Sequence, residues 1–257
     1  MKKKLFSFLV IIILLTMWAI FTKPFYTVPI LNYHSINTAQ YRKDTPKVSP
    51  ELFERQMNFI YRKGLKVISL DEYVEFLRSH KKIKNAIVIT SDDGYDDNYL
   101  YAFPVLKKYG FPATIFIIEK HIGVTSGFLN YAQIKEMEKN HISFGSHTIN
   151  HVYLPSVKSE EGLRNEIIGS KKNLEKKIGH RIDFICFPLG GYNEHIIELV
   201  KQAGYVAAFT TNRGADKLNR NIYAIKRIKI TNKDNRFSLW FKTSGYFNLF
   251  NKFKKPN

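Results

Sequence analysis

From residue 28 onward, short apolar runs alternate with amphipathic segments, and this alternation constrains the fold more than any other feature of the chain. The runs are rich in β-branched residues, as in strands buried on both faces, and the segments between them have the periodicity of helices. Predicted strands cover 28–33, 65–68, 85–90, 112–118, 142–145, 182–187, 205–209 and 223–228, and predicted helices cover 50–61, 70–78, 97–109, 131–139, 160–177 and 194–202. Strands alternating with helices form a parallel sheet with right-handed crossovers, and about seven or eight such units close or nearly close into a barrel. The sequence therefore predicts an α/β fold, a distorted or incomplete (β/α) barrel.

Several helix boundaries carry recognisable signals. Ser49 stands before Pro50, and proline is favoured at the first helical position. Ser69 and Glu72 have the spacing of a capping box. Gly179 follows the long basic segment, where glycine commonly ends a helix.

The N-terminal segment has the pattern of an export signal. Three lysines at positions 2–4 precede an apolar run from Leu5 to Phe21 that contains no charged residue. Such a run leaves the N-terminus inside and carries the rest of the chain across the membrane. No small-residue cleavage site follows, so an uncleaved signal anchor over residues 1–24 is the first interpretation and a cleaved signal peptide the second. We therefore expect an extracytoplasmic protein, either single-pass in the cell membrane or secreted.

The remainder reads as one domain and a tail. No internal repeat or low-complexity linker interrupts residues 25–235, which we interpret as a single catalytic domain. Residues 236–257 are aromatic and basic. They are expected to form a last helix that packs on the barrel, or an interfacial segment that lies on the membrane.

The chain is strongly basic, with a formal net charge of +18. Such a charge suits nucleic acid, but the export signal argues against that partner and favours an anionic envelope surface of lipid head groups or wall polymers. The alternative is a solvated basic surface with no dedicated partner. Cys186 is the single cysteine, so no intramolecular disulfide is possible and stability must come from the core.

Polar residues follow the predicted strands at the points where the strands end. They are His34, the pair Asp92 and Asp93, His147 and Pro188. The carboxyl ends of parallel barrel strands share one face, where the active sites of such folds lie. Two adjacent carboxylates at a strand end are costly unless a cation lies between them or one faces solvent, and a metal ion is the simplest answer.

His147 and His151 stand four residues apart, so both imidazoles can reach one ion. With one carboxylate they form a two-histidine, one-carboxylate set that leaves positions open for water and substrate. A zincin is excluded because Thr148 stands where that motif needs glutamate, and no Gly-x-Ser-x-Gly elbow occurs. A calcium loop fails because Phe103 occupies the position of its bidentate glutamate. A non-haem iron oxygenase stays open, although it gives no role to the second aspartate.

Three segments resemble a known family. Thr90-Ser91-Asp92-Asp93-Gly94, His147-Thr148-Ile149-Asn150-His151 and Phe187-Pro188-Leu189-Gly190 look like the first three motifs of the polysaccharide deacetylases. This is carbohydrate esterase family four, with the NodB-type deacetylase fold, and the resemblance covers roughly residues 28–230.

The resemblance implies roles for individual residues. Asp93, His147 and His151 would hold one divalent metal ion, with zinc foremost and cobalt, nickel, manganese or iron as alternatives. Asp92 would be the general base, taking the proton of the attacking water. The backbone N–H of Leu189 would help to hold the tetrahedral oxyanion.

The chain also departs from the family pattern. Cys186 stands where the third motif normally begins with arginine, Leu189 replaces the usual tyrosine, and no late Leu-x-His follows Ile228. The acid that protonates the departing amine would then be His34. Its Tyr-His context resembles the exported poly-N-acetylglucosamine deacetylases of biofilm formation, which likewise lack the arginine. The alternative for His34 is a structural histidine that caps the strand.

Four further residues are candidates for substrate binding: Tyr95, Pro188, Tyr192 and Arg227. The two tyrosines flank the site loops and could stack on a sugar ring or simply pack. Arg227 has the alternatives of orienting Asp92 or covering the surface.

We therefore expect a metal-dependent hydrolase that removes N-acetyl groups from an N-acetylglucosamine-containing polysaccharide, either poly-N-acetylglucosamine or a cell-wall glycan. Two alternatives stay open. One is an acetyl ester hydrolase acting on polysaccharide, and the other is a non-catalytic glycan-binding module of the same fold.

Overall fold

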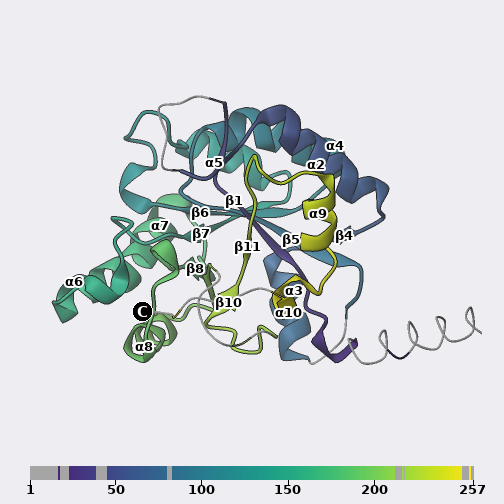
Figure 1. The fold of residues 1–257 in the computed structure, drawn as a ribbon. Coiled ribbons are helices and arrows are strands. Elements are labelled where there is room, and N and C mark those ends of the chain that lie inside the picture. Colours follow the sequence, from purple (N-terminus) through teal and green to yellow (C-terminus); the bar gives the residue numbers. More distant parts are fainter. Residues whose placement is uncertain are drawn as a thin grey trace, which may run out of the picture.

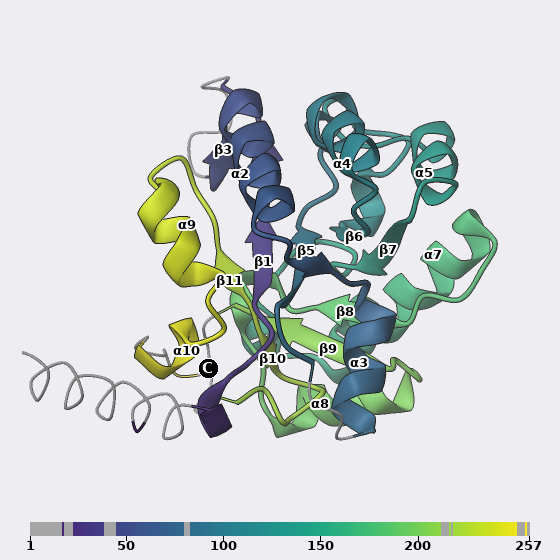
Figure 2. The same cartoon turned by 90° about the vertical axis from the view of Figure 1, so that its right-hand side faces the viewer.

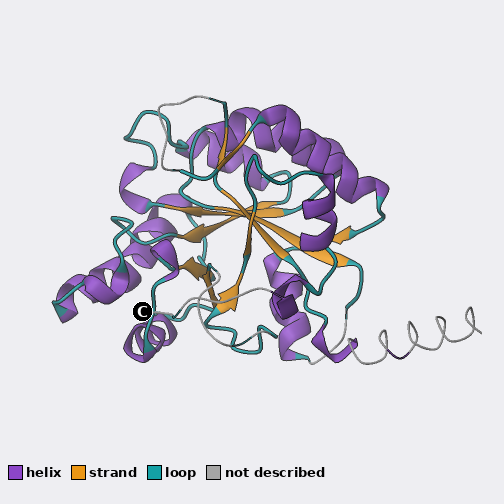
Figure 3. Ribbon diagram, viewed as in Figure 1, coloured by secondary structure: helices purple, strands orange, loops and turns teal. Residues whose placement is uncertain are grey.

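The computed structural model describes residues 23–38, 45–79, 83–211 and 218–250, together with the single residues 17, 216 and 255. Its centre is a parallel sheet that curves into a nearly closed barrel surrounded by helices (Figures 1 and 3). The strand order is β10-β9-β8-β7-β6-β5-β1-β11, and the short β4 pairs with β5 outside this path. The strands are β1 (Ile30–Tyr33), β4 (Lys66–Val67), β5 (Ala86–Ser91), β6 (Ala113–Ile117), β7 (Ile142–Ser146), β8 (Phe184–Cys186), β9 (Ala207–Thr210), β10 (Ile225–Lys226) and β11 (Ile228–Lys229). The predicted α/β barrel is confirmed.

The two ends of the sheet belong to adjacent strands of the chain. The sequence pattern predicted one strand over 223–228, whereas β10 pairs with β9 and β11 pairs with β1. Only Arg227 separates them. Because the chain changes partner at this residue, it bridges the gap between the two edges and turns the arginine out of both ladders, into the barrel mouth.

Helices and short helical turns cover the outside of the barrel (Figure 2). They are α2 (Pro50–Arg62), α3 (Leu70–Arg78), α4 (Phe103–Tyr109), α5 (Tyr131–Glu138), α6 (Glu160–Arg164), α7 (Ser170–Ile178), α8 (Glu194–Gln202), α9 (Arg236–Lys242) and α10 (Phe247–Phe250). The predicted caps form: Ser49 accepts from Leu52 N, Ser69 and Glu72 make a capping box, and Gly179 adopts a left-handed conformation after α7.

Two predicted helices contain a π-helical turn that the periodicity did not show. The turn η3 (Asn98–Ala102) precedes α4, and η6 (Asn165–Gly169) joins α6 to α7. Each inserts an extra residue into the helical repeat, and such turns are frequent at functional sites.

The core has two layers because side chains alternate along each strand. Ile30, Val88, Phe116 and Phe209 point inward and pack in the barrel interior with residues of α3. Their neighbours along the strands point outward and pack beneath the surrounding helices. Burial on both faces explains why the strands read as continuous apolar runs.

The C-terminal segment packs on the barrel as far as it is described. Leu239 of α9 is buried, and Phe247 of α10 packs against the outer layer. The backbone N–H of Thr27 donates to Gly245 O, which ties this segment to the start of the barrel. Residues 251–254, in which the membrane-surface alternative would lie, are outside the described residues.

The predicted anchor over residues 1–24 falls almost wholly outside the described part of the chain. Among the residues that are described, none of the helices has the length and apolar character needed to span a bilayer.

Candidate active site

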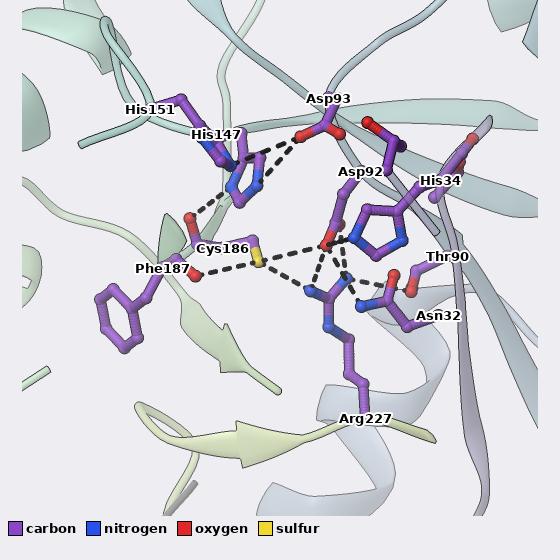
Figure 4. Close-up of polar contacts among 12 residues, drawn as sticks. Asn32, His34, Thr90, Asp92, Asp93, His147, His151, Cys186, Phe187 and Arg227 are labelled. Atoms are coloured by element: carbon purple, nitrogen blue, oxygen red, sulfur yellow. Dashed lines mark hydrogen bonds and ion pairs between the residues drawn. The ribbon is translucent and has the colours of Figure 1, made fainter. Parts of the chain in front are cut away.

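A cleft of about 920 Å³ opens at the carboxyl ends of the barrel strands. Its lining includes His34 after β1, Asp92 and Asp93 after β5, and His147 and His151 after β7. The parallel topology therefore brings together side chains that are more than a hundred residues apart in sequence, as Figure 4 shows.

Asp92 is buried and ion-paired with Arg227. The guanidinium makes two parallel bonds, Nη1 to Oδ1 at 2.7 Å and Nη2 to Oδ2 at 2.7 Å (Figure 4). Asn32 Nδ2 donates a third bond to Oδ2 at 3.2 Å. This bidentate arrangement fixes both the position and the plane of the carboxylate.

The arginine also determines the charge of Asp92. Burial by itself would raise the pKa of this carboxyl, but the Arg227 guanidinium outweighs burial and holds the pKa well below its usual range. Asp92 is therefore ionised at any physiological pH. The side chain of Arg227 is fully buried, with further bonds to Thr90 Oγ1 and Thr210 O.

Cys186 lies against the same ion pair. Its thiol is 2.8 Å from Arg227 Nη2 and 3.9 Å from Asp92 Oδ2. Burial raises the pKa of the thiol well above its ordinary value, so it remains neutral. Asp92, His147 and Cys186 could by geometry also form a metal site, but Arg227 already provides the cation there.

Asp93 has a different environment. Its Oδ1 atom is buried and has no hydrogen-bond partner. That oxygen faces Nε2 of His147 at 3.6 Å and Nε2 of His151 at 3.5 Å. Burial raises the pKa of the Asp93 carboxyl. A buried carboxylate oxygen without a donor is rare, and it indicates a missing positive partner.

The tautomer of His147 supports the same conclusion. Its Nδ1 lies 2.8 Å from the carbonyl oxygen of Cys186, so Nδ1 carries the hydrogen and Nε2 presents a lone pair to Asp93. Burial lowers the pKa of His147 to about 3, which keeps the ring neutral. A neutral ring held by its other nitrogen is the usual state of a metal-ligating histidine.

The three ligand atoms fit a metal ion. On a tetrahedral ion with bonds of about 2.0–2.1 Å, two ligand atoms are roughly 3.4 Å apart. The separations of 3.5 and 3.6 Å match this spacing. Asp93, His147 and His151 can therefore hold a divalent cation with positions left open on the cleft side.

The backbone that carries these ligands is locally strained. Asp93, Thr148 and His151 have φ values of 74°, 66° and 56°. A positive φ is especially unfavourable for a β-branched residue such as Thr148, and strain of this kind concentrates at functional sites. Gly94 follows with φ 77°, and a Cβ there would lie 2.8 Å from Ile117 Cγ2.

Glu166 holds the loop between the two histidines. Its Oε2 accepts from the backbone N–H groups of Ile149 at 3.0 Å and Asn150 at 2.9 Å, and its Oε1 accepts from Asn150 Nδ2 at 2.7 Å. Glu166 is buried and belongs to the π-helical turn η6. The other π-helical turn does the same for His34, because Asn98 Nδ2 in η3 donates to the His34 carbonyl at 2.9 Å.

His34 lies beside Asp92 in the cleft. Its Nε2 is 3.8 Å from Asp92 Oδ2, and its Nδ1 is buried with no hydrogen-bond partner. Burial lowers the pKa of His34, and the nearby carboxylates of Asp92 and Asp93 oppose that shift. The imidazole can thus exchange protons within the cleft.

The structure separates four of the remaining predicted residues, Leu189 for the oxyanion and Tyr95, Pro188 and Tyr192 for substrate binding, into two groups. Tyr95 lines the cleft, and Leu189, with φ 55°, exposes its side chain there. Pro188 is buried and Tyr192 stacks on Phe187 at 5.5 Å between ring centroids, so neither lines the cleft as described, and their assignment to substrate binding stays a prediction.

Arg227 lies at the base of the same cleft. It was assigned to substrate binding, with orientation of Asp92 or surface cover as alternatives, and its buried guanidinium is bonded to Asp92. The contact that forms is the one expected if Arg227 orients Asp92.

The sequence patterns did not predict a role for Asn32 or Glu166. Asn32 stands two residues before His34, and no motif signal marks either residue.

Comparison with known proteins gives the family. Residues 79–208 match the family model described as polysaccharide deacetylase. YxkH of Bacillus subtilis, a protein assigned to the polysaccharide deacetylases, is 36% identical over 204 residues, which are 79% of this chain and 71% of the relative. The poly-β-1,6-N-acetyl-D-glucosamine N-deacetylase of Staphylococcus aureus is 28% identical over 225 residues, 78% of each protein.

A solved structure gives the same answer. The deacetylase PplD of Streptococcus pyogenes, in complex with acetate, superposes with a TM-score of 0.77 at 29% identity, over 84% of this chain and 97% of that chain. The motifs, the barrel and these relatives agree. The chain belongs to the polysaccharide deacetylase family, with the NodB-type fold, and is related to poly-N-acetylglucosamine deacetylases.

Proposed function

We propose that this protein hydrolyses the N-acetyl groups of an N-acetylglucosamine-containing polysaccharide, using a divalent ion held by Asp93, His147 and His151. One observation carries the proposal. Of two adjacent buried carboxylates, one is ionised and fixed by Arg227, while the other points an unpartnered oxygen at two imidazole nitrogens. This is the arrangement expected of a base beside a metal site.

When bound, the ion supplies Lewis acidity that lowers the pKa of water and polarises the acetyl carbonyl. Asp92, ionised and oriented by Arg227 and Asn32, accepts the proton of the attacking water. Because Arg227 is buried behind the carboxylate, it acts through Asp92 and does not contact the sugar.

Departure of the amine requires a proton donor, since an amide nitrogen is a poor leaving group without one. His34 lies within the cleft and 3.8 Å from Asp92, so it can deliver that proton. The backbone N–H of Leu189, in the turn at the cleft edge, is proposed to stabilise the oxyanion. Zinc is the first candidate for the ion because the donor set of two imidazoles and one carboxylate is typical of catalytic zinc sites.

The relatives support the substrate class. The Staphylococcus aureus relative is a poly-β-1,6-N-acetyl-D-glucosamine N-deacetylase, and acetate, the product of such a reaction, is bound in the Streptococcus pyogenes structure. We also propose that residues 1–24 anchor the protein in the cell membrane with the barrel outside, where such polymers occur.

Acetate release from poly-N-acetylglucosamine, peptidoglycan and chitooligomers, measured side by side with zinc present, tests the proposal. We expect release from at least one polymer and none with Asp92→Asn. Zinc binding without release from any acetylated polymer would instead support a glycan-binding module. His34→Ala, assayed on an acetyl ester and on the amide, identifies the acid: amide cleavage should fall much further, because an alkoxide needs less protonation than an amine in order to leave.

A further inference from the structure

A second concave site lies away from the catalytic cleft, between α2 and α9. This groove has a volume of about 460 Å³. We call it the α2–α9 groove. Its polar lining comes from α2 and the residue after it and from the start of α9, namely Arg55, Gln56, Asn58, Arg62, Lys63, Asp234, Asn235 and Arg236. Figures 1 and 2 show α9 lying alongside α2. Lys242, at the other end of α9, lines the catalytic cleft, so one helix borders both sites.

The charges in the α2–α9 groove are not balanced. Arg55, Arg62, Lys63 and Arg236 are exposed, and none of them makes an ion pair with a described residue. Asp234 is the single carboxylate in the lining. It is already engaged, because Lys242 Nζ lies 2.6 Å from Oδ1 and Thr231 N donates to Oδ2 at 2.8 Å. Four cations therefore surround a hollow whose single acid has a cation of its own.

A buried polar side chain, Gln56, borders the same hollow. Gln56 is 2% exposed and lines the groove. Its Oε1 accepts from the Tyr33 hydroxyl at 2.9 Å, whereas its buried Nε2 has no hydrogen-bond partner. A buried N–H without an acceptor is destabilising, and native proteins usually supply a partner. The missing partner here must be an acceptor, and the surrounding cations favour an anionic one.

We propose that the α2–α9 groove binds a phosphate ester group. Arginine forks match the oxygens of phosphate, and the four exposed cations around the groove supply the opposite charge. Phe59 and Leu239 form an apolar part of the wall that suits the carbon skeleton of an ester. The product of deacetylation is a cationic polymer, so this site must hold something other than that product. The proposal is independent of the catalytic assignment.

Titration of the purified full-length chain with glycerol 3-phosphate at constant ionic strength tests the proposal. We expect saturable binding that Arg55→Gln with Arg62→Gln weakens by roughly tenfold or more, because two charge-assisted contacts are lost. The control is Lys172→Gln with Lys176→Gln on α7, which removes the same charge from an exposed face outside the groove. This control should change the affinity by less than about twofold.

Equal weakening by both double variants would show that general surface charge attracts phosphate, and the proposal would fail. Absence of saturation, or acetate binding as tight as that of the phosphate ester, would also overturn it. Gln56→Glu replaces the buried donor by an anion and should abolish binding. Acetate release from a soluble acetylated oligomer should be unchanged in the arginine double variant, which verifies its folding.

Two sources of phosphate ester are separated by the same variants. Glycerol 3-phosphate represents a soluble phosphate ester, and phosphatidylglycerol vesicles, compared with phosphatidylcholine vesicles, represent a lipid head group. Whichever source binds more tightly, the tighter binding should depend on Arg55 and Arg62 but not on Lys172 and Lys176. Binding of both sources that is insensitive to Arg55 and Arg62 contradicts the site.

Discussion

Asp92 and Asp93 are neighbours in sequence, yet the structure treats them in opposite ways. Both oxygens of Asp92 are bonded to the Arg227 guanidinium, and its charge is balanced within the protein. Asp93 Oδ1 is equally hidden from solvent but has no donor, and the atoms opposite it are imidazole nitrogens. The charge of Asp92 is balanced within the protein, whereas Asp93 and the two imidazoles form a group that could hold a cation.

The difference shows how one strand end provides two functions. A protein that pairs Asp92 with its own arginine keeps that carboxylate ionised and oriented without the metal. A protein that leaves Asp93 without a donor accepts a destabilising contact, which a bound cation would relieve. The base and the ligand can therefore be separated by experiment.

The largest expected effect on the rate of acetate release comes from replacing each of the two aspartates by asparagine in separate variants. Asp92→Asn should lower the rate of acetate release by about 10²–10⁴-fold, the range typical of a lost general base, while zinc affinity is retained. Asp93→Asn, which tolerates the same left-handed backbone, should lose zinc affinity along with activity. A zinc titration measures the metal affinity of each variant, and an acetate-release assay measures its activity. Loss of zinc in Asp92→Asn would break the proposed division of roles.

The next effect is on stability and concerns the ion pair between Asp92 and Arg227. Arg227→Met leaves Asp92 charged and buried without a partner, which should cost about 3–5 kcal/mol of unfolding free energy in a urea titration. Adding Asp92→Leu to that variant should recover most of the loss, because neither buried charge is then present. A single variant as stable as the parent would show that Arg227 does not balance Asp92.

A smaller effect, on zinc affinity, is expected when the loop between His147 and His151 loses the contacts of Glu166. Glu166→Ala removes the acceptor for Ile149 N and Asn150 N, which frees the loop between the histidines. Zinc affinity should fall by about 10–100-fold, as for other residues that hold metal ligands in place. Glu166→Gln keeps one carbonyl oxygen in position and should restore part of the affinity. Equal zinc affinity in the alanine variant and the parent would rule out this positioning role.

The last expected effect, at most about tenfold for each pH unit, is a pH dependence. An acid must carry its proton to act, and burial lowers the pKa of His34 below the ordinary 6.5, so raising the pH removes the proton. Amide hydrolysis should therefore rise as the pH decreases from about 8 to about 6, by up to roughly tenfold per pH unit. Asp92 contributes no change there, because its pKa is held far lower. His34→Gln should flatten the profile, and an unaltered profile in that variant would remove His34 from the acid role.

Much of the fold could be predicted because its signals are local. Strand runs buried on both faces, the caps at Ser49 and Ser69, and the stop at Gly179 each arise from neighbouring residues, and the structure reproduces them. The convergence of Asp93, His147 and His151 also followed, since parallel strands end on one face.

Other features depended on contacts between distant segments. The switch of partner at Arg227 occurs because β10 and β11 lie at opposite edges of a curved sheet, and no periodicity records that curvature. Tyr192 reads like a residue of the site loops but stacks on Phe187, because ring packing depends on the fold rather than on spacing. The π-helical turns that place Asn98 and Glu166 could not be read from the helical pattern either.

The sequence alone determined the α/β class and the strand ends that carry acids and histidines, because these follow from residue type and local order. Only the tertiary structure decided which aspartate is paired and which is left open, since that depends on where the curved sheet delivers one arginine 135 positions away along the chain. Charge balance in a buried site is a property of three-dimensional neighbours, and the adjacent positions of Asp92 and Asp93 could not reveal it.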